Sequence, residues 1–197
     1  MKVGFIGAGS MGSLLVGAFV KAGAMLPEDI TVSSRTPSKT AAMARRYPGL
    51  RPASSNGEAA RGSDLLFLCV KPSDFRAVLA DIAPNVRPGQ IVVSITSAVK
   101  LAQLESLLPC KIVKMIPSIV NAACAGSTLI MWGSRLDEGD RGLLTELFAS
   151  IGRPVLIKED DVRAASDLSS CGPAFFAYLL RSFADAAVRQ AGIDKET

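Results

Sequence analysis

The chain of 197 residues contains no histidine. Without imidazole there is no Ser-His-Asp or Cys-His catalysis, no HExxH zinc site and no zinc finger that uses histidine. Any proton transfer near neutral pH must come from a perturbed carboxylate, lysine, cysteine or tyrosine, from the substrate, or from water. This one absence therefore excludes several hydrolytic and zinc-dependent mechanisms.

Paired cysteines and a strong net charge are also absent. The four cysteines form no CxxC pair, which excludes a metal knuckle and a thioredoxin-type motif. One of them, Cys69, lies in an apolar run and is expected in the core. Lys and Arg number 22 against 18 Asp and Glu, with no long block of like charges, so a nucleic-acid partner is not indicated. These counts favour a reducing, cytoplasmic setting.

The sequence also lacks an unbroken hydrophobic run long enough to span a membrane. The uncharged residues 3–20 imitate a secretory signal, but their glycines recur at fixed offsets that a signal does not need. Residues 115–134 are also uncharged, yet Pro117, Asn121, Gly126 and Gly133 interrupt them. We therefore expect neither a signal peptide nor a membrane span.

Short apolar runs alternate with longer helical patterns over most of the chain. Strands are expected at residues 3–6, 30–34, 65–70, 91–95, 111–116, 127–132 and 154–158. Helices are expected at residues 11–22, 38–47, 73–82, 101–108 and 138–151, the second of them capped by Ser38. This alternation predicts an α/β fold, a Rossmann-like, doubly wound and mostly parallel sheet.

The character of the sequence changes near Lys158. Three acidic residues, 159–161, open a segment that becomes Ala-rich and helical over residues 173–191, with no further strand signal. We expect a Rossmann domain over residues 1–158 and the beginning of an all-α domain over residues 159–197. That second domain is predicted to be incomplete, because its apolar helix has nothing yet to pack on.

A GxGxxG motif follows the first expected strand and opens the first expected helix. Its residues are Gly7, Ala8, Gly9, Ser10, Met11 and Gly12. The first glycine makes the tight turn, the second lets a pyrophosphate approach the backbone, and the third lets helix and strand pack. The pyrophosphate then meets N–H groups at the positive end of the helix. We favour dinucleotide binding over a glycine-rich turn that binds nothing.

The end of the second expected strand indicates which dinucleotide binds. An NAD-specific site places Asp or Glu there to hold the ribose 2′-OH, but this chain has Ser33, Ser34 and Arg35. A guanidinium with neighbouring hydroxyls suits a 2′-phosphate, so NADP(H) is expected in preference to NAD(H). Residues 31–51 contain no acid and five basic residues: Arg35, Lys39, Arg45, Arg46 and Arg51. This bias is either a solvated helix face or a small anion-binding patch.

Further segments accompany the glycine loop. Val70-Lys71-Pro72 follows the third expected strand, and Val93-Ser94-Ile95 lies in the fourth. Residues 168–175 read Leu-Ser-Ser-Cys-Gly-Pro-Ala-Phe and are followed by Ala-Asp-Ala-Ala-Val at residues 184–188. With the opening at residues 3–11, these segments resemble the pyrroline-5-carboxylate reductase family, whose LSGSGPA segment is the most selective match. The resemblance covers essentially the whole chain.

The resemblance implies an NAD(P)H-dependent reduction of 1-pyrroline-5-carboxylate to proline, and a helical carboxy-terminal domain that interleaves with a partner's in a homodimer. With the glycine loop, the expected cofactor-binding residues are Gly7, Ala8, Gly9, Ser10, Met11, Gly12, Ser33, Ser34, Arg35, Asn56, Val70, Lys71 and Pro72. The expected substrate region comprises Pro117, Ser169, Ser170, Cys171, Gly172 and Pro173. No catalytic residue and no metal ligand is assigned. Without the resemblance, the Ser/Cys/Gly-rich residues 169–172 are either N–H donors at a helix start or an ordinary cap.

Departures from the family pattern gather in the nicotinamide half of the expected site. Thr96-Ser97-Ala98 stands where the family has Ala-Gly, and residues 116–120 read Ile-Pro-Ser-Ile-Val instead of Met-Pro-Asn-Thr-Pro. Such changes resemble a divergent branch linked to late-competence operons, and they bear on the substrate rather than on the cofactor. The family's Ser-Pro-Gly-Gly-Thr-like carboxylate loop lies beyond residue 197. The chain is therefore expected to be a fragment or to have lost competence as a reductase.

Reduction of a cyclic imine asks for little acid–base chemistry, because the imine nitrogen can already be protonated near neutral pH. The protein must hold the ring against the nicotinamide, bind the carboxylate and exclude water, which fits a chain without histidine. Tyr178 is expected in the core rather than as an acid. Two alternatives stay open: a related reductase acting on another imine, carbonyl or deazaflavin, and a non-catalytic NADP-binding regulatory protein.

Overall fold

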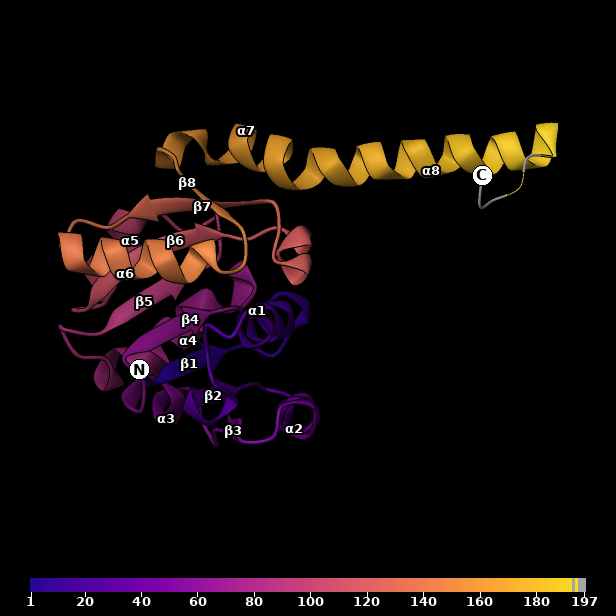
Figure 1. Cartoon of the computed structure of the whole chain (residues 1–197). Helices are drawn as coiled ribbons and strands as arrows, with labels where there is room; N and C mark the ends of the chain where they lie inside the picture. The colour runs from indigo at the N-terminus through magenta and orange to yellow at the C-terminus, as the bar shows by residue number, and fades with distance from the viewer. Residues whose placement is uncertain (193, 195–197) are drawn as a thin grey trace.

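The computed structural model describes residues 1–192 and 194 and contains one eight-stranded sheet (Figure 1). The strand order is β3-β2-β1-β4-β5-β6-β7-β8, and β6 with β7 is the antiparallel pair in an otherwise parallel sheet. The strands are β1 Val3–Ile6, β2 Ile30–Ser33, β3 Arg51–Pro52, β4 Leu65–Leu68, β5 Ile91–Ser94, β6 Lys111–Ile116, β7 Ser127–Trp132 and β8 Arg153–Leu156. The predicted mostly parallel sheet is confirmed.

Helices cover both faces of this sheet. They are α1 Ser10–Lys21, α2 Pro37–Arg46, α3 Asn56–Arg61, α4 Phe75–Ile82, α5 Leu101–Leu107, α6 Glu138–Ala149, α7 Val162–Ser166 and α8 Gly172–Ala191. Short 3₁₀ segments occur at Pro27–Asp29, Pro72–Asp74, Ala83–Asn85, Ile119–Ala123 and Glu159–Asp161. Helices α1, α2 and α6 share one hydrophobic cluster with the sheet, and α3, α4 and α5 share another. The doubly wound arrangement is thereby confirmed.

Burial on both faces explains why the central strands are continuous apolar runs. All residues of β1, β4 and β5 are buried. The rings of Phe5 and Phe67 stack with centroids 4.6 Å apart, and Phe19 of α1 tilts against Phe67 at 5.7 Å. This aromatic contact fixes α1 against β1 and β4.

The strand order reverses at β1, which has β2 on one side and β4 on the other. In open α/β sheets, ligands bind outside the carboxyl ends of the strands at such a switch point. The three strands end at Ile6, Ser33 and Leu68. The fold therefore brings the glycine loop, the loop after β2 and the loop after β4 to one edge of the sheet.

Two local predictions differ from the structure. Helix α2 begins at Pro37, with Thr36 at the N-cap, so the predicted Ser38 cap is wrong. Proline fits the first helical turn, because its φ is already helical and its missing N–H would have had no partner there.

Helix α3 was not expected, because six residues are too few for a clear hydrophobic period. A local signal was nevertheless present in Ser55 and Glu58, which have the spacing of a capping box. The Ser55 hydroxyl accepts the Glu58 N–H at 3.1 Å, and the Glu58 carboxylate accepts the Ser54 N–H at 2.7 Å.

Beyond β8, the backbone is helical without a break from Glu159 to Ala191. Helix α7 packs through Val162 and Ala165 beside β7, and α8 projects past the sheet (Figure 1). The expected turn at residues 169–172 is wrong: Asp167–Cys171 is a π-helical segment that joins α7 to α8, so it presents no helix N-terminus. Residues 193 and 195–197 of the predicted second domain lie outside the described residues, and the division after residue 158 stays a prediction.

Within residues 1–192 and 194, no helix combines the length and apolar character that crossing a membrane requires.

Asp137 gives the fold a pH dependence that can be measured. Its carboxylate caps α6 by accepting the Asp140 N–H at 2.9 Å, and it pairs with Lys111 at 2.9 Å. These contacts, the backbone hydrogen bond first, lower the pKa of Asp137 to about 2. An unfolded Asp has a pKa of about 3.9. The charged Asp137 carboxylate therefore stabilises the folded state above that pH, and this stabilisation is lost as the pH falls toward 2.

We predict that Asp137→Asn, which can still cap the helix, lowers the melting temperature at about pH 6. The difference from wild type should shrink as the pH is lowered to about 3, where the wild-type carboxylate begins to lose its charge. Thermal unfolding followed by circular dichroism measures this. Glu138→Gln, which removes the same charge one residue along, is the control, and an equal effect of both substitutions at every pH would contradict the assignment.

Candidate functional site

The turn between β1 and α1 has no room for side chains at two of its glycines. Gly7 has a φ of 108°, and a Cβ there would lie 2.3 Å from the carbonyl oxygen of Cys69. A Cβ on Gly12 would lie 2.0 Å from the Gly7 carbonyl oxygen, whereas a Cβ on Gly9 would meet nothing within 4 Å. Packing within the chain thus requires Gly7 and Gly12, while Gly9 leaves open space beside the turn.

The first turn of α1 is electropositive. The helix has Gly9 at its N-cap, with no side-chain cap and no acidic residue in its first turn. The N–H of Ser13 bonds back to the Gly9 carbonyl at 2.9 Å, and the N–H groups before it have no intrahelical acceptor. These donors and the positive end of the helix dipole suit the pyrophosphate of a dinucleotide.

A cavity of about 480 Å³ lies among the loops after β1, β2 and β4. We call it the switch-point cavity. The predicted cofactor residues that line it are Gly7, Ala8, Gly9, Ser34, Arg35, Asn56, Val70 and Lys71. Thr36 and Lys39 line it as well, so a hydroxyl and a second cation lie with Arg35 at the corner that follows β2.

Ser33 and Arg35, both predicted cofactor residues, already have protein partners. Buried Ser33 donates to Asn56 Oδ1 at 2.6 Å and holds that amide at the cavity wall. Arg35 donates from Nη1 and Nη2 to the two carboxylate oxygens of Asp74, at 3.0 and 2.9 Å. The Arg35 side chain is 81% exposed and that of Asp74 is 22% exposed. Asp74 was not predicted, because it follows a different strand and only the sheet order brings it to Arg35.

Five predicted cofactor residues do not line the switch-point cavity, among them Ser33, which lies behind Asn56. Gly12 is buried beneath Gly7, and Met11 packs on the core. Ser10 lines a neighbouring cavity on the outer side of α1, and Pro72 lines a groove between α4 and α5.

The loop after β6, which begins at the predicted residue Pro117, is held by Asn121. This fully buried side chain accepts the Ser118 N–H at 2.7 Å. It donates to the carbonyl oxygens of Ala125 and Ile151 at 3.1 and 3.0 Å. In the sequence Asn121 stood out only as a break in an apolar run, because its partners lie up to 30 residues away.

Two buried hydroxyls lie where β5 and β6 end. Ser94 is 0% exposed and Ser118 is 2% exposed, and neither oxygen has a hydrogen-bond partner within the described residues. A buried hydroxyl without a partner costs free energy unless a ligand or water satisfies it. These hydroxyls were not predicted to be functional, and they mark this edge of the sheet as a place that fits a polar ligand group.

A buried ion pair joins the sheet to the helical segment. Lys114 of β6 is fully buried, and its ammonium contacts Glu159 at 2.6 Å and the Ser97 carbonyl at 3.3 Å. The same Glu159 oxygen accepts the Leu101 N–H at 2.9 Å. Because removing one partner of a buried pair is strongly destabilising, this contact fixes the point where the helical segment leaves the sheet.

The remaining predicted substrate residues, 169–173, do not line the switch-point cavity. The Ser169 hydroxyl donates to the Ala165 carbonyl at 2.7 Å, within the helical segment. Tyr178, expected in the core, is 71% exposed on α8. The structure therefore brings eight of the thirteen predicted cofactor residues to one cavity at the edge of the sheet. Residues 169–173 of the predicted substrate region lie instead on the helical segment.

Acid–base or metal chemistry finds little support among the described residues. No group of three His, Cys, Asp or Glu side chains there could hold a metal ion. Burial raises the pKa of Cys69 and raises the pKa of Cys110 to about 11. Both thiols are protonated near neutral pH, so neither acts as a nucleophile.

Comparison with known families finds two matches along the chain. Residues 2–98, which contain β1 to β5, match the family described as NADP oxidoreductase, coenzyme F420-dependent. Residues 159–197 match the family described as pyrroline-5-carboxylate reductase dimerisation. A dimerisation region thus follows the last strand.

Individual relatives cover the entire chain. ComE operon protein 4 of Bacillus subtilis is 39% identical over 196 residues, which is 100% of this chain and 72% of that protein. Pyrroline-5-carboxylate reductase of Methanosarcina acetivorans is 31% identical, covering 100% of this chain and 73% of the relative. The crystal structure of Plasmodium falciparum pyrroline carboxylate reductase with NADP bound has a TM-score of 0.87 at 29% identity, over 100% of this chain and 72% of that one. The chain belongs to the pyrroline-5-carboxylate reductase family of NAD(P)H-dependent oxidoreductases.

Proposed function

We propose that this protein uses NADPH to reduce the cyclic imine 1-pyrroline-5-carboxylate to proline. The observation that carries the proposal is the switch-point cavity, which has a glycine loop at one end and Arg35 with Lys39 at the other. The similarity to reductases of this name supports the choice of substrate. A cytoplasmic location is part of the same proposal.

The cavity offers a partner for each charged part of the dinucleotide. The N–H groups at the start of α1 would hold the pyrophosphate, and the open side of Gly9 admits it. Ser34, Arg35 and Thr36 would hold the 2′-phosphate, because a guanidinium makes paired, charge-assisted hydrogen bonds to phosphate. Asn56, fixed by Ser33, lies where the adenine ribose is expected.

Reduction of the imine needs positioning more than proton transfer. When bound, NADPH supplies the hydride, which adds to the imine carbon while the protonated nitrogen becomes the amine. The loop that Asn121 fixes would place Pro117 and the Ser118 hydroxyl beside the ring. Residues 169–173 would form the other side of the substrate site. They belong to the helical segment, which the Lys114–Glu159 ion pair anchors to the sheet.

Hydride exchange with a deazaflavin is the second candidate, because residues 2–98 match a family described as coenzyme F420-dependent. That match covers residues 2–98 alone, whereas relatives named as pyrroline-5-carboxylate reductases span the whole chain. The imine is therefore the preferred substrate.

The preference for NADPH over NADH tests the proposed role of the residues that follow β2. Arg35→Ala is expected to weaken NADPH binding about tenfold or more and to leave NADH nearly unchanged, because one charge-assisted contact to the 2′-phosphate is lost. Asp74→Ala should strengthen NADPH binding by up to about fivefold, since it frees Arg35 from an exposed ion pair. Fluorescence titration with both dinucleotides measures this, with Arg45→Ala as the control. An equal loss of both dinucleotides in Arg35→Ala would refute the assignment.

Turnover tests the reaction. We expect the protein to oxidise NADPH when 1-pyrroline-5-carboxylate is added and to form proline in equal amount, with the Methanosarcina relative as the positive control. NADPH binding without turnover of the imine would contradict the proposed reaction. Turnover of a deazaflavin instead would favour the second candidate, and neither activity would favour a non-catalytic NADP-binding protein.

We further propose that residues 1–158 form the cofactor domain and that α8 is the core of a homodimer interface. The large apolar side chains of α8 are exposed: Phe175, Phe176, Tyr178, Leu179, Leu180 and Phe183 are 57–81% accessible. Such a contiguous apolar surface marks an interface, and the match of residues 159–197 to a dimerisation family supports a second copy as the partner.

Phe183→Glu is expected to shift the protein from dimer to monomer, because it places a charge on the most exposed aromatic ring of α8. Light scattering after gel filtration measures the mass. Gln190→Glu, which adds the same charge without removing apolar surface, should remain a dimer. A Phe183→Glu dimer with unchanged dissociation constant would contradict this interface.

A further inference from the structure

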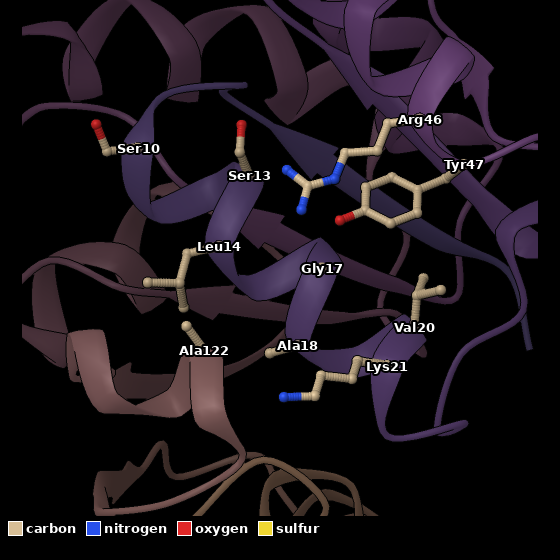
Figure 2. Close-up of a pocket in the computed structure, with 10 residues that line it drawn as sticks. All are labelled: Ser10, Ser13, Leu14, Gly17, Ala18, Val20, Lys21, Arg46, Tyr47 and Ala122. Carbon is tan, nitrogen blue, oxygen red and sulfur yellow. The ribbon is translucent and has the colours of Figure 1, made fainter.

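A second cavity, of about 650 Å³, lies on the outer side of α1 (Figure 2). Its floor is the face of α1 formed by partly buried Leu14 and Gly17 and by buried Ala18. Figure 2 shows Arg46 and Tyr47, at the end of α2, reaching over this face with their polar ends near Ser13 and Gly17. Lys21, in the last turn of α1, lies along the opposite side of the cavity. Two helices therefore contribute polar groups to one apolar floor.

The donors at this cavity lack partners of their own. No acidic residue lines it, and within the described residues neither Arg46 nor Lys21 takes part in an ion pair. The Arg46 guanidinium lies 5.4 Å from the centre of the Tyr47 ring, which leaves its N–H groups free for a ligand. The Tyr47 hydroxyl reaches α1 at Gly17, where it lies 2.7 Å from the place that a Cβ would occupy.

We propose that this α1–α2 cavity binds a small organic anion, through a phosphate or carboxylate group held by Arg46, Tyr47 and Lys21. A guanidinium, a phenol and an ammonium around one space supply charge-assisted donors for an oxyanion. The apolar floor accommodates the body of the ligand, and the volume is that of a small-molecule site.

This site adjoins the cofactor site but uses other side chains. None of Arg46, Tyr47 and Lys21 lines the switch-point cavity, although Arg46 and Tyr47 also line a space of about 370 Å³ that reaches Gly9 and Lys39. In the acid-free stretch at residues 31–51, the start of α2 thus lines the switch-point cavity and its end lines the α1–α2 cavity. The anion joins the end of α2 to α1, the helix that carries the glycine loop at its start.

The test is calorimetric titration of NADPH-saturated protein with inorganic phosphate and, separately, with acetate, at constant ionic strength. Filling the switch-point cavity with NADPH removes that cavity as a binding site for the probes, and the Arg46→Gln variant below tells binding at the α1–α2 cavity from binding elsewhere. Failure of NADPH to bind would be seen beforehand and would concern the proposed function alone. We expect saturable binding of at least one of the two probes, which also tells phosphate from carboxylate.

Arg46→Gln should weaken that binding about tenfold, as expected for the loss of a hydrogen bond to a charged group. Gly17→Ala should also weaken it, because the new methyl group displaces the Tyr47 hydroxyl, while the helix itself gains stability. Arg45→Gln, one residue away and not in the cavity lining, is the matched control. Binding of neither probe, or an equal loss in Arg45→Gln and Arg46→Gln, would overturn the proposal.

Discussion

The close approach of Gly12 to Gly7 is the contact on which the rest of the site depends. No side chain fits between the start of α1, the end of β1 and the loop after β4, where the Cys69 carbonyl closes the turn. This approach aims the first turn of α1 at the switch point of the sheet. The switch-point cavity lies at the loop before this helix, and the α1–α2 cavity lies along the helix itself.

Much of this arrangement could be predicted from the sequence, because it is local. The glycine spacing, the apolar runs and their alternation with helical patterns predict the β1–α1 turn and the parallel sheet. Ser34 and Arg35 could be expected near the glycine loop, since they follow the strand after it, and both line the switch-point cavity. Helix α3 was not predicted, although Ser55 and Glu58 have the spacing of a capping box.

The parts that could not be predicted depend on contacts between distant segments. Asp74 meets Arg35 only because β4 and β2 flank β1 in the sheet. Asn121 holds the loop after β6 through hydrogen bonds to three segments. Lys114 pairs with Glu159, which lies 45 residues further along the sequence. The helical character of residues 169–172 was missed, because serine and glycine are typical of caps, while here π-helical hydrogen bonds continue the helix.

Under the two proposals, Arg35 and Lys39 bind the cofactor and Arg46 binds the second anion, so that one basic stretch serves two sites. Arg35 and Lys39 lie before and near the start of α2 and line the switch-point cavity, whereas Arg46 ends the helix and lines the α1–α2 cavity. A crystal structure of the protein with NADP⁺ tests the cofactor assignment most directly. We expect the pyrophosphate at the N–H groups of the first turn of α1 and the 2′-phosphate against Arg35, released from Asp74. A dinucleotide bound away from the glycine loop, or a 2′-phosphate that Arg35 does not contact, would contradict it.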